Sequence, residues 1–127
     1  MGQGFFKSSY FNDLNAVEFT EEQKLAIEKQ IGSEPILIFS KSYCPYWIET
    51  KRLLESHDVS CAKIREINQE PDGLQTQAIL FKIYGQKSVP NVFIKGSHIG
   101  GNSELQNLAK SGRLKQLLDS AHISNSF

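Results

Sequence analysis

The sequence predicts a single α/β domain in which helices cover both faces of a central sheet. Short apolar runs typical of strands alternate along the chain with longer segments whose apolar residues recur at helical spacing. Strands that alternate with helices in this way form a sheet covered on both faces. The length of 127 residues suits one domain, and 39% hydrophobic and 22% charged residues are ordinary for a globular protein.

The first two predicted helices have clear start signals. One begins after Thr20, which with Gln23 has the spacing of a capping box, and it ends near Gly32. The other begins at Pro45, because proline suits the first helical turn, and continues to about Ser56. The residues of this second helix expected to face the core are Ile48, Leu53 and Leu54.

Four strands and three further helical segments follow the same pattern. The strands are expected at 35–39, 62–67, 91–94 and 97–99, the last two joined as a hairpin. The first strand is apolar throughout, which is typical of a strand buried on both faces. A third helix is expected between Asp72 and Gly85, with an apolar stripe of Leu74, Ala78, Ile79 and Ile83, and helical segments separated by Gly112 end the chain.

The bulk properties narrow the classes of function. Fourteen basic and fourteen acidic residues give zero net charge, which argues against a chain built to coat nucleic acid or an anionic membrane. No apolar run approaches membrane-spanning length, and the beginning of the sequence lacks the features of a secretory signal, so we expect a cytoplasmic protein. We expect a flexible extension at 1–17, a domain at 18–122 and a frayed end at 123–127.

Cys44 is the strongest candidate for a reactive group. It lies at a strand-to-helix turn, where unpaired N–H groups, the positive end of the helix dipole and nearby Lys41 favour the thiolate, which is the nucleophile in disulfide exchange. The alternative is a buried, inert cysteine, but Cys44 stands beside Pro45 and outside any apolar stripe. Two cysteines do not form a disulfide framework, and Cys61 is expected to be a packed structural thiol.

Three segments around this cysteine resemble the signature segments of glutaredoxins. They are 40–46 (SKSYCPY), 85–91 (GQKSVPN) and 98–102 (HIGGN), and their order and spacing agree with that family. The resemblance covers about residues 18–122 and implies a thioredoxin-like fold with a four-stranded mixed sheet. It also implies that glutathione is the co-substrate and Cys44 the nucleophile.

The resemblance assigns binding roles by position. Lys41 and Gln77 would bind the glycine carboxylate of glutathione, and Tyr46 would line the site. The backbone of Val89, before a cis Pro90, would pair with the glutathione cysteine. Read singly, each of these residues could equally be an ordinary surface or turn residue.

The remaining predicted contacts lie at the edges of the site. Ser103 and Glu104 would hold the γ-glutamyl end, although family members often carry Asp in place of Glu104. The other residues predicted to contact glutathione or to modulate the site are Ser88, Gly101, Asn102 and Pro45.

Trp47 departs from the family pattern, because dithiol glutaredoxins carry a second cysteine there and monothiol types usually carry Ser. The resolving thiol is therefore absent from this position. Trp47 could be a packed bystander, could narrow the approach to Cys44, or could have made the site a binding module with weak turnover; an engineered replacement would give the same sequence. Of these we expect activity that is retained but altered in rate.

One thiol supports a deglutathionylation cycle, so the expected function is reduction of protein–glutathione mixed disulfides by a monomer with no bound metal. The expected partners are glutathione, glutathionylated proteins and, indirectly, glutathione reductase. Two alternatives stay open: a dimer that binds a [2Fe–2S] cluster through one cysteine per subunit and two glutathiones, and a catalytically silent interaction module.

Overall fold

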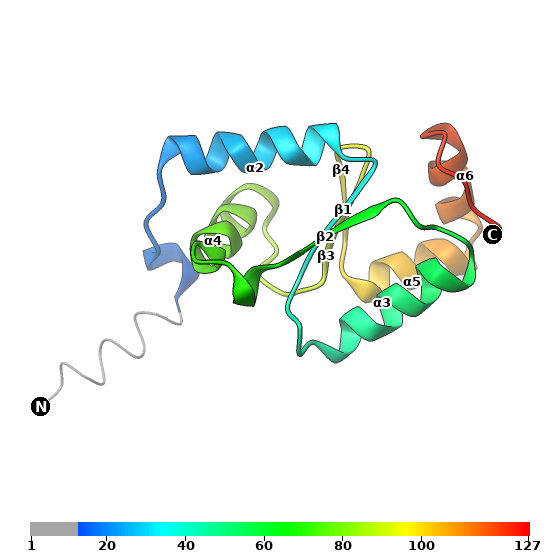
Figure 1. Cartoon of the computed structure of the whole chain (residues 1–127), viewed down its shortest axis with the longest axis horizontal. Helices are drawn as coiled ribbons and strands as arrows, with labels where there is room; N and C mark the ends of the chain where they lie inside the picture. The colour runs from blue at the N-terminus through cyan, green and yellow to red at the C-terminus, as the bar shows by residue number, and fades with distance from the viewer. Residues whose placement is uncertain (1–12) are drawn as a thin grey trace, which may run out of the picture.

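The computed structural model describes residues 13–127 and confirms the predicted fold class, a four-stranded mixed sheet flanked by helices (Figure 1). The strand order across the sheet is β2-β1-β3-β4. The strands are β1 (Ile36–Ser40), β2 (Ala62–Glu66), β3 (Asn91–Ile94) and β4 (Ser97–Gly100). The α-helices are α2 (Glu21–Ser33), α3 (Pro45–Ser56), α4 (Gly73–Tyr84), α5 (Asn102–Lys110) and α6 (Arg113–Ser120), with short 3-10 turns η1 (Leu14–Ala16) and η2 (Ile67–Gln69).

β1 is the central strand that organises the sheet. It runs parallel to β2 and antiparallel to β3, and all five of its residues are buried, as a strand covered on both faces requires. β3 and β4 form the predicted hairpin. Lys95 (φ 45°) and Gly96 (φ 81°) both take left-handed backbone conformations at its turn, which suits a two-residue hairpin connection.

The two faces of the sheet carry separate apolar cores, because successive side chains of a strand point to opposite sides. Leu37 and Phe39 of β1 pack with α2 and α4, whereas Ile36 and Ile38 pack with α3, α5 and α6. Figure 1 shows the same division, with α2 and α4 on one side of the sheet and α3 and α5 on the other. β1 therefore reaches the Cys44 turn between two packed layers.

Local signals placed most helix ends correctly, but not every inward face. The Thr20 hydroxyl accepts from the Gln23 N–H at 3.1 Å and the Gln23 side chain accepts from the Thr20 N–H at 2.8 Å, so the capping box is confirmed. The prediction for Ile48 is wrong: its side chain is 56% exposed. Leu54 is buried as predicted, and Thr50, four positions before it, completes the buried face of α3. Leu74 of the predicted α4 stripe is likewise exposed.

The C-terminal end packs onto the domain, which corrects the expectation of a frayed segment at 123–127. Ile123 is buried in the core cluster on the α3, α5 and α6 side. The Ser126 N–H donates to the His57 carbonyl at 2.7 Å, and the Phe127 ring stacks on the His57 imidazole with centroids 3.9 Å apart. Apolar burial and one backbone hydrogen bond thus hold this end at the C-terminal end of α3.

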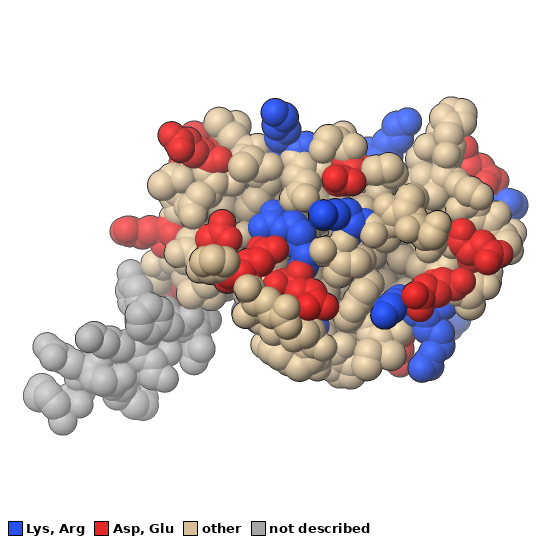
Figure 2. All heavy atoms as spheres, viewed as in Figure 1, with Lys and Arg blue, Asp and Glu red and all other residues tan. Residues whose placement is uncertain are grey.

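The N-terminal extension predicted at 1–17 falls mainly on residues 1–12, which lie outside the described residues. Its described part forms η1, which contacts α4. Within residues 13–127, no helix has the length and apolar character needed to cross a membrane. Acidic and basic side chains are interspersed over the face in Figure 2, in keeping with the zero net charge.

Candidate active site

Cys44 lies at the end of the turn that connects β1 to α3. It is the N-cap residue of α3, Pro45 occupies the first helical position, and the Cys44 side chain makes no capping hydrogen bond. The Cys44 N–H donates to the Lys41 carbonyl at 3.0 Å, which closes the turn. The side chain is only 7% exposed. The sulfur therefore sits at the positive end of a helix, as the sequence predicts.

A second element fixes this turn from the side. Asn68 of η2 accepts a hydrogen bond from the Ser42 N–H at 3.0 Å and donates one to the Ser42 hydroxyl at 2.7 Å. The two bonds between one amide and one residue fix the orientation of the segment that carries Cys44. Sequence reasoning missed Asn68, because 26 residues separate it from Ser42 and no local pattern links them.

The thiol faces the loop that precedes β3. The Val89–Pro90 peptide bond is cis, as predicted. Cys44 Sγ lies 3.4 Å from the Val89 carbonyl oxygen and donates a hydrogen bond to it. The structure thus joins the cysteine and Val89, two predicted site residues 45 positions apart.

Side-chain donors hold every carbonyl of this loop from Lys87 to Pro90. Gln77 Nε2 donates to the Lys87 carbonyl at 2.6 Å, and Gln86 Nε2 donates to the Ser88 and Pro90 carbonyls, each at 3.1 Å. The Val89 carbonyl accepts the hydrogen bond from the Cys44 thiol described above. Gln77, predicted to bind a carboxylate, therefore has its amide engaged with the loop.

The α5 N-terminus forms the third part of the site. Glu104 Oε1 accepts from the Gly101 N–H at 3.2 Å, so Glu104 caps its own helix. Asn102 faces away from solvent: its Oδ1 accepts from the Thr50 hydroxyl at 2.9 Å, and its Nδ2 donates to Glu49 at 2.9 Å. The Asn102 side chain thus ties α5 to α3, whereas Ser103 is exposed.

The other predicted residues lie around the turn itself. Tyr46 is 61% exposed and Lys41 is half-buried. Ser88 is exposed, with its carbonyl held by Gln86 as above. Among residues 13–127, no three His, Cys, Asp or Glu side chains gather where they could hold a metal ion.

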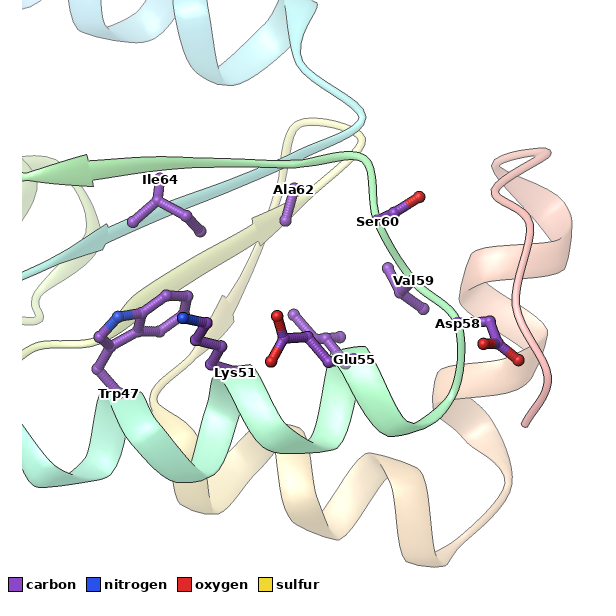
Figure 3. Close-up of a pocket in the computed structure, with 9 residues that line it drawn as sticks. Trp47, Lys51, Glu55, Asp58, Val59, Ser60, Ala62 and Ile64 are labelled. Carbon is purple, nitrogen blue, oxygen red and sulfur yellow. The ribbon is translucent and has the colours of Figure 1, made fainter.

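Trp47 turns away from the loop and toward the sheet. Its half-buried indole packs against the core on the α3 side. Figure 3 shows Trp47 pointing from α3 toward Ile64 of β2, where it lines a cavity of about 500 Å³. Lys51 and Glu55 line the same cavity, but Cys44 does not. The chemistry of the thiol, and not this cavity, marks the candidate active site.

Cys61 is exposed, so the prediction of a packed structural thiol is wrong. It lies just before β2, which begins at Ala62, and so it belongs to the connection and not to the buried part of a strand. A residue between two elements has no periodicity from which its burial could be inferred. The two thiols differ clearly, since Cys44 is buried at a helix terminus and Cys61 is in a solvent-exposed connection.

Comparison with known proteins decides the family. A family profile described as Glutaredoxin matches residues 36–99, a segment that contains Cys44 and the cis-proline loop. The chain belongs to the glutaredoxin family. The family gives the chain its general class, that of the glutathione-dependent thiol oxidoreductases.

Individual glutaredoxins are similar to this chain in sequence and in structure. Glutaredoxin-C2 of Arabidopsis thaliana is 44% identical over 91 residues, which are 72% of this chain and 81% of the relative. A buckwheat glutaredoxin solved as a complex with glutathione superposes with a TM-score of 0.76 at 35% identity, covering 82% of this chain and 97% of that one. A wheat glutaredoxin gives a TM-score of 0.74 at 41% identity, covering 80% of this chain and 98% of that one.

Proposed function

We propose that this glutaredoxin reduces protein–glutathione mixed disulfides with Cys44 as its single reacting thiol. The observation that carries the proposal is the pairing of Cys44 Sγ with the Val89 carbonyl at the N-terminus of α3, where Trp47 replaces a second thiol. A helix N-terminus favours the thiolate, and the thiolate is the attacking species in exchange.

The proposed cycle balances with one protein thiol. The Cys44 thiolate attacks the glutathione sulfur of the mixed disulfide, the S–S bond breaks, and the substrate protein leaves as a thiolate that takes up a proton. The thiolate of a free glutathione then attacks the glutathione sulfur held on Cys44. Oxidised glutathione leaves, and the Cys44 thiolate is regenerated.

The Val89 backbone links binding to this chemistry. Its carbonyl accepts a hydrogen bond from the Cys44 thiol. A glutathione whose cysteine paired with the Val89 backbone would compete for the same carbonyl, and a thiolate has no proton with which to hold it. The ligand and the Cys44 thiol would therefore bind to the same backbone group.

A glutathione-coupled turnover assay on a glutathionylated protein tests the proposal, with glutathione reductase recycling the product. We expect the unmutated chain to turn over and Cys44→Ser to lose at least a hundredfold in rate, because the serine hydroxyl is not a competent nucleophile in disulfide exchange. Cys61→Ser is the matched control, since it removes the exposed thiol, and it should keep full activity. An inactive unmutated chain, or loss of activity in Cys61→Ser with Cys44→Ser active, would overturn the proposal.

A further inference from the structure

A chain of polar side chains lies behind the loop that faces Cys44. His98 Nε2 lies 2.9 Å from Asn91 Oδ1 and 3.2 Å from Gln86 Oε1. Gln86 in turn donates from Nε2 to the Ser88 and Pro90 carbonyls. These contacts connect β4, where His98 stands, to the two residues that flank Val89.

The loop itself determines the direction of every bond in this chain. Backbone carbonyls only accept hydrogen bonds, so the Gln86 group facing Ser88 and Pro90 must be the NH₂ group. The Gln86 carbonyl oxygen then faces His98, which must donate from Nε2. His98 is therefore in the tautomer with its proton on Nε2, shared between two acceptors.

The surroundings of His98 hold it in that state. Its ring packs beside Tyr84 and Phe93, with centroids 5.3 Å and 5.1 Å away. Burial lowers the pKa of His98 below its ordinary value, although the negative charge of Glu104 opposes the shift. The imidazole is thus neutral at neutral pH, and its only ring N–H points at Gln86 and Asn91.

We propose that His98, acting through Gln86, is a positioning residue for glutathione binding at the Val89 backbone. The inference rests on the proposed function, because it assigns the Val89 backbone to the ligand. Gln86 fixes the carbonyls on both sides of Val89, and His98 fixes the rotation of the Gln86 amide. Without the His98 donor, the Gln86 carbonyl oxygen loses a partner, so the amide holds the carbonyls on both sides of Val89 less firmly.

Steady-state kinetics on the full chain test the inference. In His98→Leu we expect the KM for the glutathionylated substrate to rise about fivefold, as loss of one hydrogen bond predicts, with kcat within about twofold. His98→Gln should restore the KM, because a glutamine Nε2 can donate where the imidazole Nε2 did. Gln86→Leu should raise the KM as well, and the double variant His98→Leu/Gln86→Leu should be no worse than Gln86→Leu alone.

A matched control separates positioning from a general effect on the fold. His57 is also partly buried, with Nδ1 2.9 Å from the Leu53 carbonyl, but it lies at the C-terminal end of α3. His57→Leu should leave the KM unchanged. Equal KM changes in the two histidine variants, additive effects in the double variant, or an unchanged KM in His98→Leu would each overturn the inference.

A measurement that needs no turnover keeps the inference distinct from the proposed function. The nitrogen shifts of His98 in NMR spectra should show the proton on Nε2, and the Val89 amide signal should move in His98→Leu but return toward its original position in His98→Gln. A proton on Nδ1, or a Val89 signal indifferent to His98→Leu, would contradict the inference even in an active enzyme. An inactive chain with the expected NMR behaviour would refute the proposed function and retain the positioning of the loop.

Discussion

At the scale of single residues, the direction of Trp47 separates interpretations that the sequence leaves open. A sequence places an indole three positions after Cys44, but it does not show which way the side chain points. The indole packs against the core on the α3 side and lines the cavity between α3 and β2, whose lining does not include Val89. This favours a structural role for Trp47 over a direct effect on the reaction.

Trp47→Ala should therefore lower the free energy of unfolding and spare the reaction. We expect a loss of about 2 kcal/mol, less than for a fully buried tryptophan, because the indole is half-buried. The kcat/KM for a glutathionylated substrate should stay within about threefold, because no described contact joins the indole to the thiol. Urea denaturation and the coupled turnover assay measure the two quantities.

Tyr46→Ala is the matched control, because Tyr46 stands next to Trp47 and is 61% exposed. Its free energy of unfolding should change by no more than about 0.5 kcal/mol, as for most surface positions. If Tyr46 lines the site as the family resemblance implies, the kcat/KM of Tyr46→Ala for the glutathionylated substrate should fall several-fold. The opposite pattern, with a large activity loss in Trp47→Ala alone, would mean that the indole acts on the approach to Cys44.

At the scale of elements, the packing of η2 against the start of α4 depends on one glycine. A Cβ on Gly73 would overlap the carbonyl oxygen of Ile67, which is a backbone atom and cannot move aside without disturbing η2. η2 also carries Asn68, which fixes the Ser42 segment of the active-site turn. The close approach at Gly73 thus supports the position of the reactive cysteine from a distance.

Gly73→Ala should destabilise the fold by about 2 kcal/mol or more, because the clash forces a shift of the backbone. Gly32→Ala is the control: nothing lies within 4 Å of the added methyl group, and Gly32 lies within α2. That substitution should stabilise the protein by about 0.5 kcal/mol, since alanine is the better helix former. Thermal or urea unfolding of both variants provides the measurement, and equal effects of the two would contradict this view of Gly73.

The elements themselves were largely predictable, because their signals are local. Pro45 and the apolar spacing placed α3, the Thr20–Gln23 pair placed the start of α2, and Gly85 (φ 75°) ends α4 as expected of a glycine. Ile48 fits more than one face of the helix, because it follows two other apolar or aromatic residues, Tyr46 and Trp47, at the helix start. Such ambiguity disappears only when the sheet that the helix covers is known.

At the scale of the whole molecule, the site joins segments that the sequence alone cannot bring together. The cysteine follows β1, Val89 precedes β3, and these two strands pair antiparallel, so the end of one meets the beginning of the other. The family resemblance named both groups in advance. The contacts that orient them, from Asn68 and Gln86, depend on the three-dimensional fold and carry no local signal.

The same geometry bears on the alternative of an iron–sulfur dimer. A [2Fe–2S] cluster takes four thiolate ligands, so a chain with one thiol at its site could bind it only as a pair of copies with two glutathiones. The indole of Trp47 packs against its own sheet. What opposes a shared cluster is Pro45 at the first position of α3, because its fixed backbone angle stiffens the turn that carries Cys44.

We therefore expect the chain purified anaerobically with glutathione to be a colourless monomer. Visible absorption spectra and size-exclusion chromatography with light scattering check both properties on the same sample. Cys44→Ser serves as the reference, since it removes the ligand that a shared cluster would need, and its spectrum should match that of the unmutated chain. A brown, glutathione-dependent dimer that disappears in Cys44→Ser would contradict this expectation and establish cluster binding at the site where we place disulfide exchange.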